Sequence, residues 1–250
     1  MTAWRRWVRR PQDVWLRKVM FQIHLWSGLG LGLYVVMLSV TGSILVYGRQ
    51  LNRWLATPGS STLTPGQWTM LKLTALHDEL LLGRDGLWWN GVGSLLVTLL
   101  VLTGLVVWWP GSSRWRRSLG VSVSGGWTRF NWDLHSAMGF WLAGFLLIWG
   151  VSGFYLGIPG PFTAIALMTE RPDGTSAGDE ALAWLVRLHF GRWRTPWLQA
   201  VWAVIGLAPA AMFVTGTIMW WKRVVRPARR RRALGARDAT ALDAPETAAS

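Results

Sequence analysis

The sequence predicts an all-α integral membrane protein: a four-helix bundle built from two tandem two-helix repeats, with short amphipathic periplasmic helices. Long apolar stretches, an internal repeat and an uneven distribution of basic residues lead to this prediction. Of the 250 residues, 51% are hydrophobic and 15% are charged, and the mean hydropathy is +0.26. Charged residues are absent over long windows, so lipid is the expected solvent for much of the chain.

Four apolar stretches are long enough to cross a hydrocarbon core of ~30 Å at a helical rise of ~1.5 Å per residue. These predicted spans are residues 21–47, 87–109, 132–156 and 197–221. The first is too long for the apolar region of a signal peptide, and no small-residue cleavage site follows it. We therefore expect it to remain as a membrane anchor, with only short loops between the spans.

The placement of basic residues predicts the orientation. Six Lys and Arg residues precede the first span, four lie between the second and third, and eight follow the fourth, whereas each of the other two loops has four. This bias predicts cytoplasmic N- and C-termini, and the basic tail is expected to touch anionic lipid. The net charge of +14 therefore indicates membrane topology, and we expect no nucleic-acid partner. Because the chain has no cysteine, disulfides, Fe–S clusters and covalently attached haem are excluded.

An internal repeat includes all four histidines. The first histidine of each copy precedes a Thr-Gly or Ser-Gly pair at one constant spacing, and the second precedes a Thr-Gly pair at another. The equivalent motifs are His24 with Thr41-Gly42 and His135 with Ser152-Gly153, then His77 with Thr103-Gly104 and His189 with Thr215-Gly216. Such a constant offset indicates two equivalent units. The predicted segments are a cytoplasmic basic N-terminus (1–20), repeat unit 1 (21–110), a cytoplasmic loop (111–131), repeat unit 2 (132–222) and a disordered basic cytoplasmic tail (223–250).

The histidines are the candidate functional residues, because ionisable groups are costly within membrane spans. His24 and His135 lie near the cytoplasmic ends of their spans, and His77 and His189 lie in the outer loops. We expect two facing pairs, one at each level of the membrane. Two neutral imidazoles from facing helices can supply both axial ligands of a haem iron. The alternative is that each histidine only hydrogen-bonds to neighbouring helices.

Gly28 and Gly139 each follow a histidine by one helical turn, so they share its helical face. A residue without a side chain there would let a flat macrocycle approach the backbone, although bare helix packing would also explain both glycines. The run Gly28, Gly30 and Gly32 is not a dinucleotide-binding fingerprint, because it lies within an apolar span with no preceding strand.

The sequence also contains candidate residues for a site that binds another metal and for contacts with the charged groups of a haem. Zinc sites gather three or four ligands, whereas each level offers two histidines with acidic residues nearby: Asp78, Glu79 and Asp133. A metal transporter or channel is an alternative, but few other polar groups lie within the spans. Basic residues that could face haem propionates, or simply lipid headgroups, are Lys18 and Arg129 on the cytoplasmic side and Arg84, Arg192 and Arg194 outside.

The ordered motifs resemble the PepSY-associated transmembrane helix family of bacterial inner membranes, which includes di-haem ferric-siderophore reductases. In the first unit, the resemblance rests on 21–28 (FQIHLWSG), 38–42 (LSVTG), 76–83 (LHDELLLG), 102–105 (LTGL) and 108–109 (WW). In the second unit it rests on 131–135 (NWDLH), 188–191 (LHFG), 215–216 (TG) and 219–223 (MWWKR).

The resemblance implies a multi-pass protein of the inner (cell) membrane with two haem b groups, whose iron is ligated by His24, His135, His77 and His189. It further implies transmembrane electron transfer that reduces ferric iron or a ferric siderophore in the periplasm. Many relatives carry large periplasmic insertions, whereas the outer loops here are short, so electron transfer to a partner protein is one alternative. A cofactor-free accessory subunit of an iron-uptake system is another. The donor would be quinol or a cytoplasmic reductase, since no flavin or nicotinamide domain is recognisable.

Overall fold

The computed structural model describes residues 2–171, 176–191, 193, 195–229, 231 and 234, and this part of the chain is all-helical apart from an isolated bridge between Glu170 and Ser176. The predicted all-α class is thus confirmed. The helices are α1 (Ala3–Arg9), η1 (Pro11–Asp13), α2 (Trp15–Gly30), α3 (Gly32–Leu45), α4 (Gly48–Leu55), α5 (Pro65–Glu79), α6 (Gly83–Trp108), η2 (Trp115–Leu119), α7 (Gly126–Trp141), α8 (Ala143–Gly157), α9 (Gly160–Leu167), α10 (Ala177–Phe190), α11 (Pro196–Gly206), α12 (Ala208–Trp220) and the π-helical turn η3 (Trp221–Val225).

Two helices of the described chain are long and apolar enough to cross a membrane: Gly83–Trp108 and Pro196–Arg229. Two further pairs of helices would qualify if each bent pair formed one span, namely α2 with α3 and α7 with α8. The total is then up to four, by length and composition. The fourth helix continues through residues 223–229, which the sequence analysis places in a disordered tail; residues 235–250 of that tail lie outside the described part.

The two bent pairs have the same geometry at equivalent positions. Helices α2 and α3 meet at an angle of 61°, and α7 and α8 at 60°. The breaks fall at Leu31 and Leu142, and each lies about two helical turns after the first histidine of its repeat unit. Hydrophobicity does not reveal the breaks, because the flanking residues stay apolar. At the first of them, Gly30 and Gly32 flank Leu31, and glycine is a common cause of sharp helix kinks.

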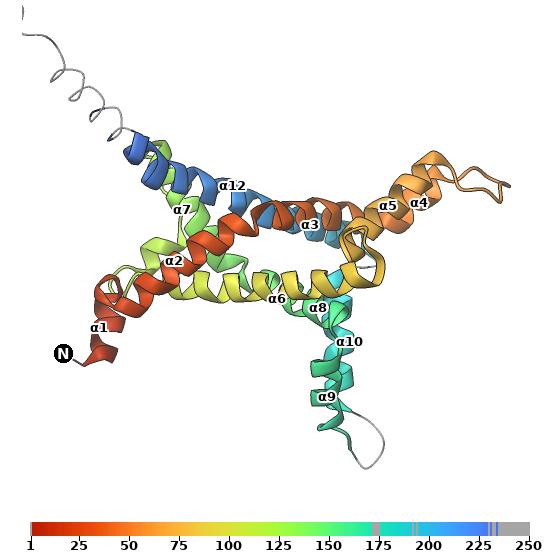
Figure 1. Ribbon diagram of the computed structural model, residues 1–250, viewed down its shortest axis with the longest axis horizontal. Coiled ribbons are helices and arrows are strands. Elements are labelled where there is room, and N and C mark those ends of the chain that lie inside the picture. Colours follow the sequence, from red (N-terminus) through yellow and green to blue (C-terminus); the bar gives the residue numbers. More distant parts are fainter. Residues whose placement is uncertain are drawn as a thin grey trace, which may run out of the picture.

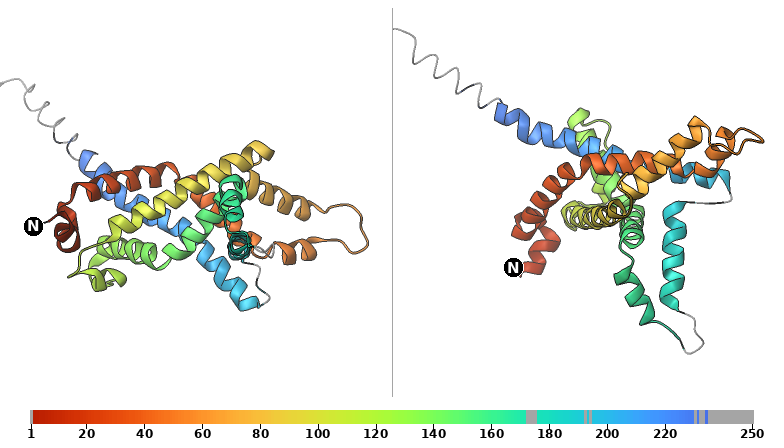
Figure 2. Two further views of the ribbon diagram at one scale, coloured as in Figure 1. Left: turned by 90° about the horizontal axis from the view of Figure 1, so that it is seen from below. Right: turned by 45° about the vertical axis from the view of Figure 1, so that its right-hand side comes forward.

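The two termini of the described chain lie at one end of the molecule (Figure 1). We call this end, formed by residues 2–20, 115–130 and 221–229, the terminal end. Helices α4 and α5 project from the opposite side, and α9 and α10 project as a separate arm (Figures 1 and 2). We call the region of α4, α5, α9 and α10 the far end. The outer loops that the sequence predicts to hold short helices are therefore helical.

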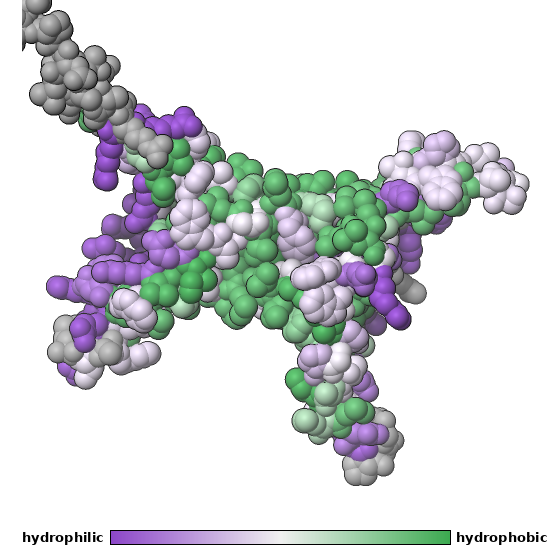
Figure 3. All heavy atoms as spheres, in the orientation of Figure 1, coloured by the Kyte–Doolittle hydropathy of each residue, from purple (hydrophilic) through white to green (hydrophobic). Residues whose placement is uncertain are grey.

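Apolar residues cover the middle of the molecule, and hydrophilic residues gather at the terminal end and on the far-end arms (Figure 3). Large apolar side chains remain exposed on the spans, including Leu33 (80% exposed) and Val204 (69%). Small polar side chains are buried instead: Ser39, Thr41, Ser43, Ser94, Ser152 and Thr215. This inside-out distribution is typical of a protein whose spans face lipid and pack through small residues.

Helices α6 and α8 approach each other closely through small residues. A Cβ atom on Gly157 would lie 2.5 Å from Cα of Gly91, and a Cβ atom on Gly91 would lie 2.8 Å from a side-chain carbon of Ile158. The two backbones therefore touch, and because α6 belongs to repeat unit 1 and α8 to repeat unit 2, this contact joins the two units.

We expect Gly157→Leu to destabilise the protein by roughly 2 kcal/mol, because the added side chain must push α6 and α8 apart. The measurement is thermal unfolding in detergent, monitored as the loss of the monodisperse peak in size-exclusion chromatography. Gly144→Leu is the matched control on the same helix, since a Cβ atom there meets nothing within 4 Å. Equal losses in the two variants would contradict the close packing.

Candidate functional site

The structure brings the four histidines together in the two pairs that the repeat predicts. His24 of α2 and His135 of α7 have ring centroids 6.5 Å apart, with 75° between the ring planes. His77 of α5 and His189 of α10 have centroids 6.4 Å apart, with 63° between the planes. We call these the inner pair and the outer pair. Each pair takes one histidine from each repeat unit.

The separation within each pair can be compared with two arrangements. A direct hydrogen bond between imidazoles, with N···N near 2.9 Å, would put the centroids about 5.2 Å apart. Two imidazoles on opposite sides of one metal ion, with each metal–nitrogen distance near 2.0 Å, would put them about 6.3 Å apart. The separations of 6.4 and 6.5 Å match the second arrangement. An edge-to-face contact between the rings also gives centroid separations in this range. The hydrogen bonds of the ring nitrogens are therefore needed to distinguish such a contact from an arrangement that suits metal ligation.

Every Nδ1 atom contacts the hydroxyl group of a Ser-Gly or Thr-Gly pair in the same repeat unit. The contacts are His24 with Thr103 (3.4 Å), His77 with Thr41 (2.8 Å), His135 with Thr215 (2.9 Å) and His189 with Ser152 (2.6 Å). In the sequence, these pairs mark only the repeat. In the structure, the histidine of one helix in a unit is held by the hydroxyl of another helix in that unit.

These hydroxyls determine which ring nitrogen carries the proton. Each donates its own proton to a backbone carbonyl of its helix: Thr41 to Met37 (2.7 Å), Thr103 to Leu100 (2.8 Å), Ser152 to Ile148 (2.5 Å) and Thr215 to Ala211 (3.0 Å). The hydroxyl oxygen is then left to accept, so Nδ1 is the donor in each contact. His24 Nδ1 also lies 3.1 Å from the carbonyl oxygen of Leu100, which can only accept.

The other ring nitrogen, Nε2, is therefore unprotonated and has a free lone pair. No hydrogen bond links any of the four Nε2 atoms to another residue in the described part of the chain. A neutral imidazole with Nδ1–H fixed by a neighbour and Nε2 unprotonated is the form that ligates a metal. Chemically, the two pairs are suited to axial ligation of iron.

Glycines give the rings the space that this arrangement requires. A Cβ atom on Gly42 would lie 2.9 Å from Cε1 of His77, one on Gly104 would lie 2.9 Å from Cε1 of His24, and one on Gly216 would lie 3.3 Å from Cε1 of His135. These are the glycines of the Thr-Gly pairs. Cβ atoms on Gly28 and Gly139 would instead approach Leu100 (3.7 Å) and Met212 (3.3 Å), so these two glycines lie beside neighbouring helices.

The outer pair lines a cavity of about 270 Å³. Its walls are mostly apolar or small, with residues of α3, α6, α8 and α11 among them. Asn90 of α6 fixes the end of α5 at this cavity, since its side-chain amide donates to the carbonyl oxygens of His77 (2.8 Å) and Asp78 (3.0 Å). Tyr34 in turn donates to the Asn90 side chain at 2.7 Å. This support was not predicted from the sequence, because no spacing rule connects residues 34, 77 and 90.

Buried hydrogen-bond donors without a partner lie toward both ends of the spans. Within the described chain they include Arg17 Nε and the indole nitrogens of Trp108, Trp109 and Trp220 toward the terminal end, the indole nitrogens of Trp193 and Trp202 toward the far end, and the hydroxyls of Ser43 and Thr217. An unpaired buried donor costs roughly 1–3 kcal/mol, and every atom of this set can serve a carboxylate. The carboxylates of a bound group, such as the two propionates of a haem, are acceptors of the kind that such donors require.

Arg17 is a half-buried cation of the terminal end, and it was not among the predicted propionate partners. Its Nη2 atom donates to the carbonyl oxygen of Val107 at 2.6 Å. It precedes His24 by two turns along the same helical face, so helical spacing could have identified it.

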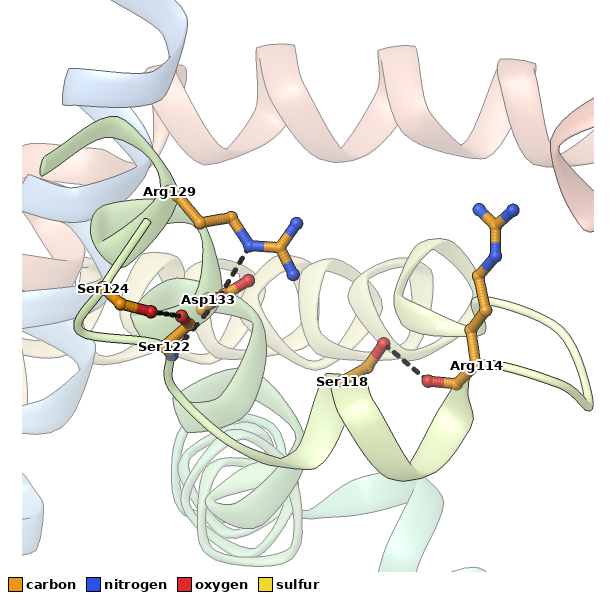
Figure 4. A network of polar contacts seen from close by, with 6 residues as sticks. All are labelled: Arg114, Ser118, Ser122, Ser124, Arg129 and Asp133. Atoms are coloured by element: carbon orange, nitrogen blue, oxygen red, sulfur yellow. Dashed lines mark hydrogen bonds and ion pairs between the residues drawn. The ribbon is translucent and has the colours of Figure 1, made fainter. Parts of the chain in front are cut away.

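The predicted propionate partners are placed differently. Arg129 pairs with Asp133, with Nε 2.8 Å from Oδ2 (Figure 4), and Asp133 also accepts from the backbone N–H of Ser122. Lys18 and Arg84 are exposed, and Arg192 and Arg194 lie outside the described residues. No group of three or more His, Asp or Glu side chains that could hold a metal ion occurs in the described chain, so Asp78, Glu79 and Asp133 add no third ligand to either pair.

The all-helical fold, the apolar surface and the paired imidazoles define a class: helical membrane proteins with paired histidines inside the protein. The chain belongs to the family described as the PepSY-associated TM region, whose model matches residues 21–67, 57–175 and 166–223. This confirms the resemblance drawn from the ordered motifs. No curated protein and no solved structure matches the chain.

We expect Thr41→Val to shift the tautomer of His77, because the variant keeps the shape of the side chain but removes the acceptor for Nδ1–H. The measurement is the ¹⁵N chemical shift of the imidazole nitrogens in histidine-labelled protein, where Nδ1 should lose protonated character. Thr98→Val is the control, since the Thr98 hydroxyl bonds only to the carbonyl oxygen of Ser94. An unchanged His77 signal would show that the hydroxyl does not select the tautomer.

Proposed function

We propose that this chain is an inner-membrane cytochrome b that moves electrons across the bilayer and reduces ferric iron or a ferric siderophore in the periplasm. The single observation that carries the proposal is the pair of imidazoles at each of two levels, with every Nδ1 held and every Nε2 free. Membership of the PepSY-associated family supports the membrane setting.

The proposal assigns the spans to a four-helix bundle of two tandem repeats. The bent pairs α2–α3 and α7–α8 would each cross once, as would α6 and α11–α12. The terminal end, with its basic residues, would be cytoplasmic and the far end periplasmic. The inner and outer pairs would then lie near opposite faces of one bilayer.

Haem b, held by His24 with His135 and by His77 with His189, would supply reversible one-electron chemistry at each level. The residues of the chain explain why this chemistry would be limited to electron transfer. Two imidazoles of the chain would hold each haem, so the chemistry supplied there would be electron transfer and not direct binding of oxygen or substrate. The hydroxyls hold both rings, so little reorganisation is needed when the charge at the site changes.

We expect the protein purified from haem-replete cells to give b-type bands in the reduced-minus-oxidised spectrum. His24→Ala should remove the inner haem and His77→Ala the outer haem, so each variant should retain about half the signal, and the two losses should differ in redox potential. Wild-type protein without b-type bands would contradict the cytochrome assignment. If it still assembled with iron-uptake proteins, it would be an accessory subunit.

We expect proteoliposomes with dithionite trapped inside to reduce a ferric chelate added outside, because the two pairs would connect the two faces. The measurement is formation of a coloured ferrous complex by an external chelator. His24→Ala and His77→Ala should each lower the rate to that of protein-free liposomes. Unaltered rates in both variants would contradict electron transfer through the histidine pairs. Iron flux without any reductant would indicate a transporter.

A further inference from the structure

A second, polar cleft lies at the far end and is not part of either histidine pair. It has a volume of about 640 Å³ and is lined by Arg49, Asn52 and Arg53 of α4 together with Trp193 and Gln199. Arg49 and Arg53 are one helical turn apart, so both guanidinium groups lie on the same helical face. None of the described residues that line the cleft is acidic.

The two arginines have no counter-ion within the described chain. The one ion pair found among the described residues is Arg129 with Asp133 at the terminal end, so the positive charge of the cleft is not neutralised there. Arginine presents a planar set of donors that fits carboxylates in a bidentate manner. The cleft thus favours an anionic, carboxylate-bearing ligand.

The amides of the cleft provide further polar contacts. Gln50 Nε2 donates to Oε1 of Gln199 at 2.9 Å, and the Oε1 atom of Gln50 is buried without a partner. Gln199 is only 6% exposed, so this pair forms the polar floor of the cleft. A ligand with a hydroxyl or amide donor, in addition to its carboxylates, would satisfy the unpaired oxygen.

The cleft lies directly beside the cavity of the outer pair. Val46 lines that cavity and lies four residues before Gln50, and Trp202 lines it and follows Gln199 by about one turn of α11. The rings of Trp193, in the cleft, and Trp202, in the cavity, have centroids 5.5 Å apart and 73° between their planes. A molecule in the cleft is therefore separated from the outer pair by tryptophan side chains.

We propose that the Arg49/Arg53 cleft binds the periplasmic electron acceptor, and that this acceptor is a small anionic ferric chelate with carboxylate groups. The redox role rests on the proposed function, whereas the binding does not. In the reaction, one electron delivered at the far end converts the bound Fe³⁺ to Fe²⁺, and no bond of the protein forms or breaks. The chelate approaches through water, so large periplasmic domains are not required for its capture.

Binding is tested with gallium(III) citrate in place of ferric citrate. Both are citrate chelates, but the gallium ion is not reduced at the site. Isothermal titration of the full-length protein in nanodiscs of uncharged lipid should detect binding that weakens with salt. The double variant R49Q/R53Q should weaken it by roughly tenfold, as expected for the loss of two partly exposed ion pairs. R49K/R53K should restore part of the affinity, because the charge returns without the bidentate geometry.

The control is the double variant K72Q/R187Q, which removes the same charge from exposed far-end positions on α5 and α10. It should bind gallium citrate as the wild type does. Equal weakening in the control would overturn the proposal, because a general electrostatic effect would then account for the binding. The absence of gallium citrate binding by the wild type would also overturn it, even if the haem spectrum were present.

A kinetic comparison separates this inference from the proposed function. Oxidation of the dithionite-reduced protein by ferric citrate should slow in R49Q/R53Q, whereas oxidation by a cationic ferric hydroxamate should not. A protein without haem would still report gallium binding, so failure of the proposed function is recognisable by itself. If R49Q/R53Q instead lost haem from the outer pair and kept gallium binding, the arginines would serve haem propionates, and the proposal would be wrong.

Discussion

The hydrogen bond from a histidine Nδ1 to a hydroxyl on a neighbouring helix of its repeat unit is the interaction on which the site depends. Each of these hydroxyls is already committed as a donor to its own helix. That commitment leaves the hydroxyl oxygen as an acceptor, which keeps the histidine proton on Nδ1 and leaves Nε2 unprotonated. The arrangement costs little, because Ser and Thr readily bond to a carbonyl one turn back within an apolar helix. The same local motif therefore occurs four times and orients the imidazoles of both the inner pair and the outer pair.

Much of the arrangement could be predicted from the sequence because the repeat carries it. The pairing of His24 with His135 and of His77 with His189 follows from their equivalent places in two copies and from the depth of each span. The hydroxyl partners were not predicted, because spacing along a chain does not say which of two Thr-Gly pairs faces a given ring. His24 is nearer in sequence to Thr41 but is held by Thr103, on the antiparallel neighbour.

Features that depend on tertiary packing were missed for a related reason. The breaks at Leu31 and Leu142 lie within uninterrupted apolar sequence, so hydropathy treats each bent pair as one straight span. Arg17 was overlooked in favour of Lys18, since the two differ only in the helical face that they occupy. Only the packed structure shows that one is half-buried and the other exposed. Asn90 supports the outer pair through the end of α5, a role that no motif marks.

The way in which the two repeat units share the histidine sites has a consequence for the assembly and the evolution of the protein. Each ring is held by its own unit, whereas each pair combines one ring from each unit, so a single unit contains two prepared half-sites and no complete one. Two identical copies of such a unit, associating about a twofold axis, would complete both sites at once. A duplicated and fused homodimer is thus a sufficient origin for this chain. A fragment ending after α6 would still present oriented imidazoles, but with nothing opposite them.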